Sequence, residues 1–170
     1  MKLFLVGHMA SGKTTVGEKL SLLLDLRWVD TDQWIEGRMC KAIPEIFSMH
    51  GESVFRQKEE ECLDFLINQD NLVISCGGGM PCYDRTIDLM NELGETIYLR
   101  TPIDTLASRL WLNKNNRPKI PFFNDENTLR EFVSTELINR EKYYMQSKYI
   151  IETKGKSVFE VSNEIKILFR

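Results

Sequence analysis

The feature that most constrains this chain is a glycine-rich segment that directly follows a short apolar run. Residues 2–6 read KLFLV, and behind them stands the spacing G-x-x-x-x-G-K-[ST], formed by Gly7, Gly12, Lys13 and Thr14. This spacing is typical of a loop whose backbone N–H groups cradle phosphate at the start of a helix. An amphipathic stretch over residues 16–24 supplies that helix. The alternative, a flexible turn with a surface lysine, requires neither the strand before it nor the helix after it.

The side chains of this loop have distinct expected roles. Lys13 can neutralise the β- and γ-phosphates of a nucleotide, and the Thr14 hydroxyl suits Mg²⁺, a cation that prefers oxygen ligands. The loop therefore predicts a nucleotide and a magnesium ion, but it does not predict which reaction follows.

The rest of the chain alternates between strand-like and helix-like segments. The strand-like runs are 2–6, 27–30, 72–76, 96–100 and 149–152. The helix-like stretches are about 13–25, 32–39, 43–49, 52–68, 83–92, 103–112, 127–145 and 157–169. This alternation predicts an α/β fold with a parallel sheet and helices on both faces. Residues 113–125 interrupt it with prolines, asparagines and basic residues, so we expect a mobile lid there.

Composition narrows the class of protein further. The 170 residues, 42% hydrophobic and 28% charged, suit one soluble domain over residues 1–170. A net charge of −3 gives no basic field for nucleic acid, and no apolar run is long enough to cross a membrane or to act as a signal peptide. The cysteines are scattered and have no histidine cluster beside them, which favours reduced thiols in the cytoplasm over a zinc site; they are Cys40, Cys62, Cys76 and Cys82.

Polar residues follow several of the expected strands, where an open α/β sheet binds its ligands. Asp30 and Asp32 follow the second run; one could hold a water of Mg²⁺ and the other could accept a proton from an attacking hydroxyl. The alternative is that an aspartate here only caps a helix. The third run is followed by three glycines, Gly77, Gly78 and Gly79, whose backbone a ligand can approach closely. The alternative is that they form only a flexible turn.

Two arginines on helix-like segments are ambiguous by spacing alone. Arg56 lies in GESVFRQKEEE and Arg140 in INREKYY, and a lone arginine on a charged helix is usually a solvated ion-pair partner. Arginine is also the side chain whose planar fork best fits a carboxylate.

Taken in order, these motifs resemble the shikimate kinase family over nearly the whole chain. The family pattern GxMGxGK[ST]T[VI]G is similar to residues 7–17, and D-[ST]-D to residues 30–32. G-E-x-x-F-R-x-x-E is similar to residues 51–59, and the GGG to residues 77–79. R-P-L is similar to Arg117-Pro118-Lys119, and R-x-P-L-Y to residues 140–144. Ala10 departs from the pattern, which has glycine there.

The resemblance implies an activity and a fold. The activity is ATP-dependent phosphorylation of the 3-hydroxyl of shikimate in aromatic amino acid biosynthesis, by a cytoplasmic protein that we expect to be a monomer. The fold is a five-stranded parallel sheet in the order 2-3-1-4-5.

The resemblance also implies roles for individual residues. The ATP phosphates would lie on Ala10, Ser11, Gly12, Lys13, Thr14 and Thr15. Thr14 would ligate Mg²⁺, and Asp30 would support the ion through water. Asp32 would bind a shikimate hydroxyl and act as the base, Arg56 and Arg140 would clamp the carboxylate, and the ring would face Gly78 within Gly77–Gly79. Catalytic Arg117 would reach over the phosphates from the lid, and Arg109 and Lys156 would contact the adenine end.

Three other functions remain to be weighed. A gluconate or nucleotide kinase would share the loop. A nucleotide kinase could also use arginines, to bind the phosphate of its substrate, so Arg56 and Arg140 do not by themselves distinguish it from an enzyme with a carboxylate substrate. A GTP-dependent switch would need D-x-x-G and N-K-x-D, but no aspartate here has glycine three residues later, and Asn113-Lys114-Asn115-Asn116 ends in asparagine. A nucleotide-binding relic without catalysis would be expected to lack Lys13, Asp32 or an arginine.

Overall fold

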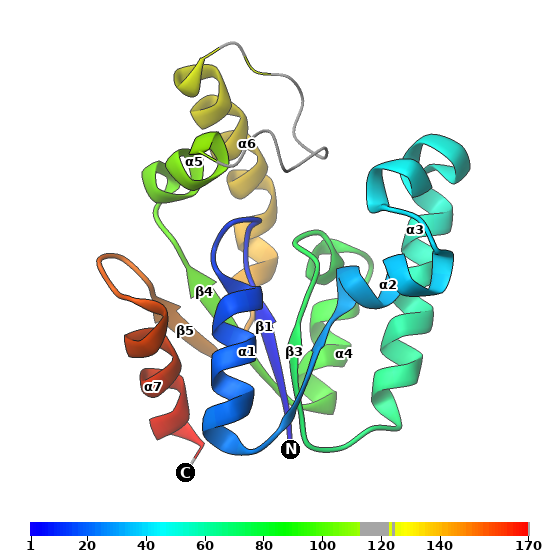
Figure 1. The fold of residues 1–170 in the computed structure, drawn as a ribbon, viewed down its shortest axis with the longest axis vertical. Helices are drawn as coiled ribbons and strands as arrows, with labels where there is room; N and C mark the ends of the chain where they lie inside the picture. Colours follow the sequence, from blue (N-terminus) through cyan, green and yellow to red (C-terminus); the bar gives the residue numbers. More distant parts are fainter. Residues whose placement is uncertain (113–122, 124, 170) are drawn as a thin grey trace.

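The fold is a five-stranded parallel sheet between two layers of helices (Figure 1). The computed structural model describes residues 1–112, 123 and 125–169. The strands are β1 (Lys2–Val6), β2 (Arg27–Asp30), β3 (Leu72–Ser75), β4 (Glu95–Arg100) and β5 (Tyr149–Glu152). Their order across the sheet is β2-β3-β1-β4-β5, which confirms the expected α/β class and strand order.

The helices that cover this sheet agree with the expected stretches to within a few residues. They are α1 (Lys13–Leu24), α2 (Thr31–Met39), α3 (Ile43–Ile67), α4 (Thr86–Leu93), α5 (Ile103–Leu112), α6 (Glu126–Tyr144) and α7 (Val158–Leu168), with a short 3₁₀ helix, η1, at Met80–Cys82. The largest difference is the start of α4, expected at residue 83. Asp84 has a left-handed backbone, with φ 45°, which separates η1 from the helix that begins at Thr86.

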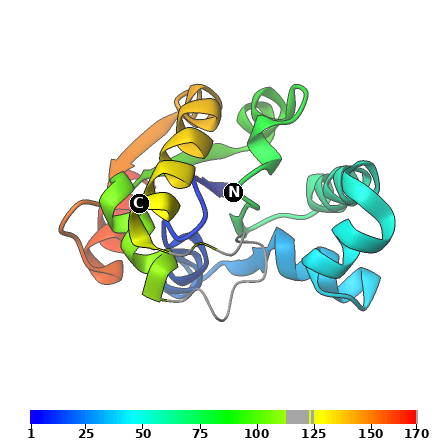
Figure 2. The ribbon, with the colours of Figure 1, turned by 90° about the horizontal axis from the view of Figure 1, so that it is seen from above.

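The two faces of the sheet bury different side chains, as the alternation of a β-strand requires. Leu3 and Leu5 of β1 pack with residues of α1 and α7. Phe4 and Val6 point to the opposite face and pack with α3, α4, α5 and α6. Seen from above in Figure 2, α1 and α7 lie on one side of β1, and α4 and α6 lie on the other. Both layers therefore depend on the central strand that leads into the glycine-rich loop.

Helix α2 and the first part of α3 project to the side of the sheet (Figure 1). Their contact is a third small core made of Ile35, Ile43, Ile46 and Phe55. Helix α3 is interrupted at Gly51, where φ is 79° and ψ is 174°, so it consists of two helical segments in tandem. This agrees with the two helix-like stretches expected on either side of residue 51.

The expected lid and the expected absence of a membrane-spanning segment both depend on which residues the structure describes. Arg117 and almost all of the expected lid lie outside those residues. Over residues 1–112, 123 and 125–169, none of the helices combines the length and the apolar character that a membrane crossing requires.

Candidate active site

The glycine-rich loop occupies the turn between the carboxyl end of β1 and the first residue of α1. Gly12, directly before the helix, has φ 98°, a conformation that side-chain-bearing residues rarely adopt. Ala10 also has a left-handed backbone, with φ 64°, although it carries a Cβ. A non-glycine residue in this region costs on the order of 1–2 kcal/mol. The loop therefore holds a strained alanine where the resembling family has glycine.

Lys13 folds back over the concave side of the loop. Its Nζ donates hydrogen bonds to the carbonyl oxygens of Gly7, at 2.9 Å, and His8, at 2.8 Å. The side chain is buried, so these bonds hold the loop in its wrapped shape.

Asp30 joins the end of β2 to the loop. Its Oδ2 accepts a hydrogen bond from the Thr14 hydroxyl at 2.9 Å, and its Oδ1 accepts from the amides of Asp32, at 3.0 Å, and Gln33, at 3.2 Å. Asp30 is therefore the N-cap of α2 and contacts the loop as well. Burial raises the pKa of Asp30, and these hydrogen bonds oppose the rise.

The pair formed by Thr14 and Asp30 has the chemistry that a magnesium site needs. A hydroxyl and a carboxylate meet within hydrogen-bond distance, both supply oxygen, and both line the cavity over the loop. Mg²⁺ usually keeps only one or two protein ligands and takes the others from phosphate and water. Over the described residues, no group of three or more His, Cys, Asp or Glu side chains is arranged to hold a metal.

A cavity of about 440 Å³ lies directly over the loop. Most of the residues expected at a nucleotide line it: Ala10, Ser11, Gly12, Lys13, Thr14, Thr15, Arg109 and Lys156. Arg109 donates from Nη1 to the Ala10 carbonyl at 3.0 Å, and Lys156 pairs with Glu164 at 2.5 Å. Two basic residues far apart in the sequence thus reach the same cavity as the loop.

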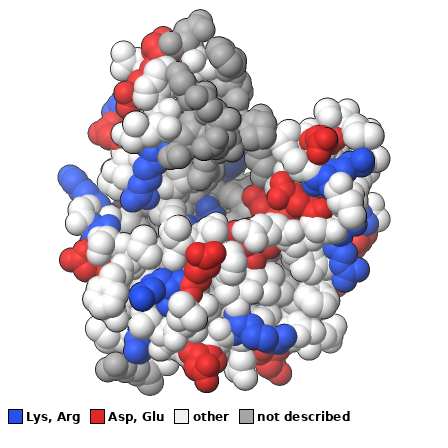
Figure 3. Space-filling model, viewed as in Figure 1, with Lys and Arg blue, Asp and Glu red and all other residues white. Residues whose placement is uncertain are grey.

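A second cavity, of about 700 Å³, opens beside the first. It extends toward α2 and α3 and is lined by both aspartates, both arginines and the glycine triplet: Asp30, Asp32, Arg56, Arg140, Gly77, Gly78 and Gly79. The two cavities share Met9, Thr14, Asp30, Asp32 and Gly78. In Figure 3, acidic side chains gather beside the hollow on the side of α2 and α3. Two ligands bound in these cavities would meet at the shared residues.

The glycine triplet is where the two arginines converge. A Cβ added to Gly79 would lie 2.9 Å from Nη1 of Arg56, and a Cβ added to Gly78 would lie 3.6 Å from Nη1 of Arg140. Arg56 comes from α3 and Arg140 from α6, so the triplet lies between guanidinium groups from opposite sides of the cavity.

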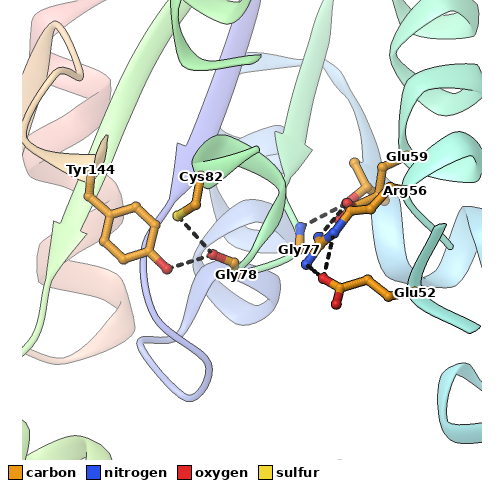
Figure 4. Close-up of polar contacts among 8 residues, drawn as sticks. Glu52, Arg56, Glu59, Gly77, Gly78, Cys82 and Tyr144 are labelled. Carbon is orange, nitrogen blue, oxygen red and sulfur yellow. Dashed lines mark hydrogen bonds and ion pairs between the residues drawn. The ribbon is translucent and has the colours of Figure 1, made fainter. Parts of the chain in front are cut away.

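Each arginine is also paired with glutamate on its own helix. Arg56 contacts Glu52 at 2.8 Å and Glu59 at 2.6 Å (Figure 4). Burial alone would lower the pKa of Arg56, but the hydrogen bonds and charges of these carboxylates outweigh it, and the pKa is raised. Arg140 pairs with Glu136 one turn earlier in α6. Both guanidinium groups are therefore fixed in position without a ligand.

Two hydrogen bonds to the glycine triplet could not be predicted from the sequence. The Thr31 hydroxyl accepts a hydrogen bond from the Gly77 amide at 2.8 Å. The Tyr144 hydroxyl donates to the Gly78 carbonyl at 2.6 Å. Thr31 and Tyr144 stand inside the quoted motifs, but motif spacing alone does not say which backbone group a hydroxyl will reach. The glutamates at i−4 and i+3 from Arg56, in contrast, were a readable signal for its pairing.

Comparison with known proteins gives a consistent result. Residues 9–168 match the family described as shikimate kinase. A shikimate kinase of Flavobacterium psychrophilum is 42% identical over 99% of this chain and 99% of its own length. One from Parabacteroides distasonis is 37% identical over 98% and 99%.

Solved structures agree. The crystal structure of shikimate kinase from Bacteroides thetaiotaomicron superposes with a TM-score of 0.90 at 32% identity, covering 99% of this chain and 96% of that one. The structure of shikimate kinase from Acinetobacter baumannii in complex with shikimate gives 0.87 at 32% identity, covering 99% and 92%.

Proposed function

This chain belongs to the shikimate kinase family, and we propose that it transfers the γ-phosphoryl group of ATP to the 3-hydroxyl of shikimate. The observation that carries this proposal is the meeting of two cavities at Thr14, Asp30, Asp32 and Gly78. One cavity has the phosphate loop as its floor, and the other contains two arginines suited to a carboxylate. A phosphoryl donor and an acidic acceptor would thus react across a shared wall.

Phosphoryl transfer depends on positioning and on neutralising charge, and the loop supplies both. The phosphates of ATP would lie on the backbone of Ala10–Thr15 at the start of α1, where the N–H groups and the helix dipole favour negative charge. Lys13 Nζ, now bonded to two loop carbonyls, would turn toward the phosphate that is transferred. Arg109 and Lys156 would border the adenine end of the nucleotide.

Asp32 would direct the acceptor. Its carboxylate lies against the glycine triplet, since a Cβ on Gly77 would be 2.7 Å from Asp32 Oδ1. A carboxylate there can accept a hydrogen bond from the 3-hydroxyl and take its proton as the phosphoryl group arrives. Arg56 and Arg140 would hold the shikimate carboxylate from two sides, with the ring against Gly77–Gly79. Fixing the far end of the ring in this way aims the hydroxyl.

We include Mg²⁺ in the proposal because Thr14 and Asp30 present matched oxygen groups over the loop. The ion, when bound, would neutralise the charge of the phosphate oxygens. Thr14 would ligate it, and Asp30 would orient Thr14 and hold a water of the ion. We also propose that Arg117, outside the described residues, reaches over the phosphates from a lid at about 113–125.

We further propose a single domain over residues 1–170 that works as a monomer in the cytoplasm. Free cysteines at Cys40, Cys62, Cys76 and Cys82 support a reducing compartment.

The proposal is tested by an assay of ADP release with a panel of acceptors. Shikimate, quinate, gluconate and nucleoside monophosphates would be supplied separately with ATP and Mg²⁺. We expect the highest kcat/KM with shikimate, and a fall of about a hundredfold or more in the Lys13→Ala variant, which loses a charge on the transferred group. A higher kcat/KM with gluconate or with a nucleoside monophosphate would show that shikimate is not the substrate. Near-native turnover by folded Lys13→Ala would remove the phosphate-loop mechanism.

A further inference from the structure

The glycine triplet is held from two sides by buried hydroxyl groups. Thr31 and Tyr144 are both fully buried, at 0% exposure. Thr31 accepts from the amide of Gly77, and Tyr144 donates to the carbonyl of Gly78. Because three consecutive glycines lack side chains to fix their backbone, these two bonds are strong constraints on a segment that would otherwise be permissive.

Tyr144 sets the direction of one peptide group. It is the last residue of α6, and its ring packs on buried Tyr98 at 5.2 Å between centroids. The Gly78 carbonyl belongs to the same peptide plane as the amide of Gly79, and in a trans peptide these two groups point in opposite directions. Holding the carbonyl toward Tyr144 therefore turns the Gly79 amide away from it. Figure 4 shows Arg56 on that opposite side of Gly78.

Each hydroxyl also belongs to an element that carries a proposed substrate residue. Tyr144 lies one turn after Arg140 on α6. Thr31 is directly before Asp32 in the first turn of α2. A shift of α6 or of α2 would therefore move the triplet together with an arginine or an aspartate.

We infer that Tyr144 and Thr31 are positioning residues, which orient the Gly77–Gly79 backbone so that the Gly79 amide faces the ligand carboxylate between Arg56 and Arg140. The inference rests on the proposed function for the identity of that ligand. Neither hydroxyl lines the cavity around the triplet, so each acts through the glycine backbone and not by contact with substrate. The Tyr144 bond governs the carboxylate end, and the Thr31 bond governs the end next to Asp32.

Isosteric variants and matched controls separate this role from ordinary stability. Tyr144→Phe removes only the hydroxyl that reaches Gly78, and Tyr98→Phe removes the hydroxyl of its packed neighbour, which contacts Glu141 at 3.4 Å. Thr31→Val removes the acceptor of the Gly77 amide. Thr96→Val removes an equally buried acceptor from the Lys148 amide, at 2.9 Å and away from the site.

Two measurements are made on each variant. The first needs no substrate: NMR residual dipolar couplings report the orientation of the Gly79 N–H vector, and hydrogen exchange reports protection of the Gly77 amide. We expect Tyr144→Phe to change the Gly79 coupling and Thr31→Val to speed exchange at Gly77. The second is calorimetry, in which Tyr144→Phe should raise the Kd for shikimate by about tenfold and leave the Kd for ATP within about twofold.

The outcomes divide cleanly. Couplings of Gly79 that are unchanged in Tyr144→Phe, or a loss of shikimate affinity that is equal in Tyr98→Phe, would overturn the inference. If the native protein does not bind shikimate, the proposed function fails, and the couplings and exchange still decide whether the two hydroxyls orient the triplet.

Discussion

Asp30 and Asp32 carry the same side chain, so only their surroundings can give them different roles. Asp30 caps α2 with one oxygen and holds Thr14 with the other, whereas the Asp32 carboxylate lies against Gly77. The helix-cap interpretation of this motif is thus correct for Asp30, which combines it with a contact to the phosphate loop. In the proposed mechanism, these surroundings assign Asp30 to the nucleotide and Asp32 to the acceptor.

Asparagine substitution should resolve the two roles. Asp32→Asn keeps size and hydrogen bonding but cannot take a proton, so we expect a rate loss of about a hundredfold, the lower end for general-base catalysis, with apparent Mg²⁺ affinity nearly unchanged. Asp30→Asn should raise the Mg²⁺ requirement and keep shikimate affinity, since asparagine still caps α2. Turnover measured against Mg²⁺ and against shikimate checks both variants. A Mg²⁺ dependence that follows Asp32 would reverse the assignment.

His8 is a buried imidazole inside the loop, 1% exposed, whose Nδ1 contacts the Met9 carbonyl at 3.0 Å. Burial lowers its pKa to about 4, and the charges of Lys13 and Arg140 act in the same direction. Between pH 6.5 and about 4, His8 is therefore mostly protonated in the unfolded chain and mostly neutral in the folded protein. Stability from this group is complete above pH 6.5 and is lost as the pH falls.

We expect the free energy of unfolding to drop by about 3 kcal/mol through His8 as the pH falls from 7 to 4. His8→Asn, which retains a donor near the Met9 carbonyl, should lose that part of the dependence. Urea unfolding at a series of pH values measures the difference, and His50→Asn removes an exposed histidine as the control. Parallel pH curves for native protein and His8→Asn would contradict the assignment.

At the scale of elements, the two arginines come from helices that are far apart in the sequence. Arg56 lies on α3 and Arg140 on α6, and the glycine triplet after β3 stands between them. Sequence motifs could predict both side chains, and glutamates three or four residues away could predict their pairing, but not that the two guanidinium groups would meet at the glycine triplet. The exact direction of an arginine depends on packing between helices, which a local pattern does not encode.

Replacing either arginine should raise the KM for shikimate and leave that for ATP nearly unchanged. Removal of one charged partner from a partly buried site costs on the order of 2–4 kcal/mol. A shikimate derivative with its carboxylate amidated should bind weakly to the native protein and lose little more in Arg56→Ala or Arg140→Ala. Arg85→Ala, at an exposed site before α4, is the control for loss of charge. If amidation of the carboxylate lowered the affinity equally in the native protein, Arg56→Ala and Arg140→Ala, the two arginines would not be binding that carboxylate.

Helix α1 and strand β3 approach so closely that a side chain does not fit between them. A Cβ on Gly17 would lie 2.4 Å from Ser75 Oγ and 2.7 Å from Trp28 Nε1. Trp28 Nε1 donates a hydrogen bond to Ser75 Oγ at 3.0 Å, and Ser75 Oγ donates to the Lys13 carbonyl at 2.9 Å. The second and third strands thus fix the first turn of α1 directly.

Gly17→Ala should therefore push α1 away from the sheet, lower the free energy of unfolding by about 1–3 kcal/mol and weaken ATP binding. Gly37→Ala is the matched control, because Gly37 lies within α2 and an added Cβ meets nothing within 4 Å. Alanine there should stabilise the protein by about 0.5–1 kcal/mol. Thermal unfolding and ATP titration of both variants provide the measurement. Equal effects at the two positions would contradict the close approach.

For the whole molecule, the parallel sheet and its helical layers were predictable from buried apolar runs that alternate with amphipathic stretches, whereas the strand order followed from the resemblance to the family. The division of helices between faces was not, because an amphipathic pattern shows that a helix has an apolar face without showing which sheet face it covers. Helix α7 illustrates this: it is last in the chain, yet Val161 and Ile165 pack in the same core as Leu3, Leu5 and Leu20.

Ile165→Ala should thus lower the free energy of unfolding by about 2–4 kcal/mol, although it lies far in sequence from every site motif. Ile167→Ala, in the same helix but 69% exposed, should change it by less than about 0.5 kcal/mol. Urea unfolding gives both values, and assays with saturating ligands should give similar kcat for the folded variants. Comparable losses at 165 and 167 would contradict this account of the core.

The central place of β1 also bears on how the protein is made. Strand β1 pairs with β3, which is synthesised after α1, α2 and α3, and with β4, which is synthesised later still. Helix α1, which follows the loop, can pack against α7 only after α7 has been made. A nascent chain therefore carries the phosphate-binding sequence early but has no neighbouring strands to shape it. ATP in the cell would meet a formed site only after these later elements have been made, and it would stabilise the folded domain without guiding its first steps of folding.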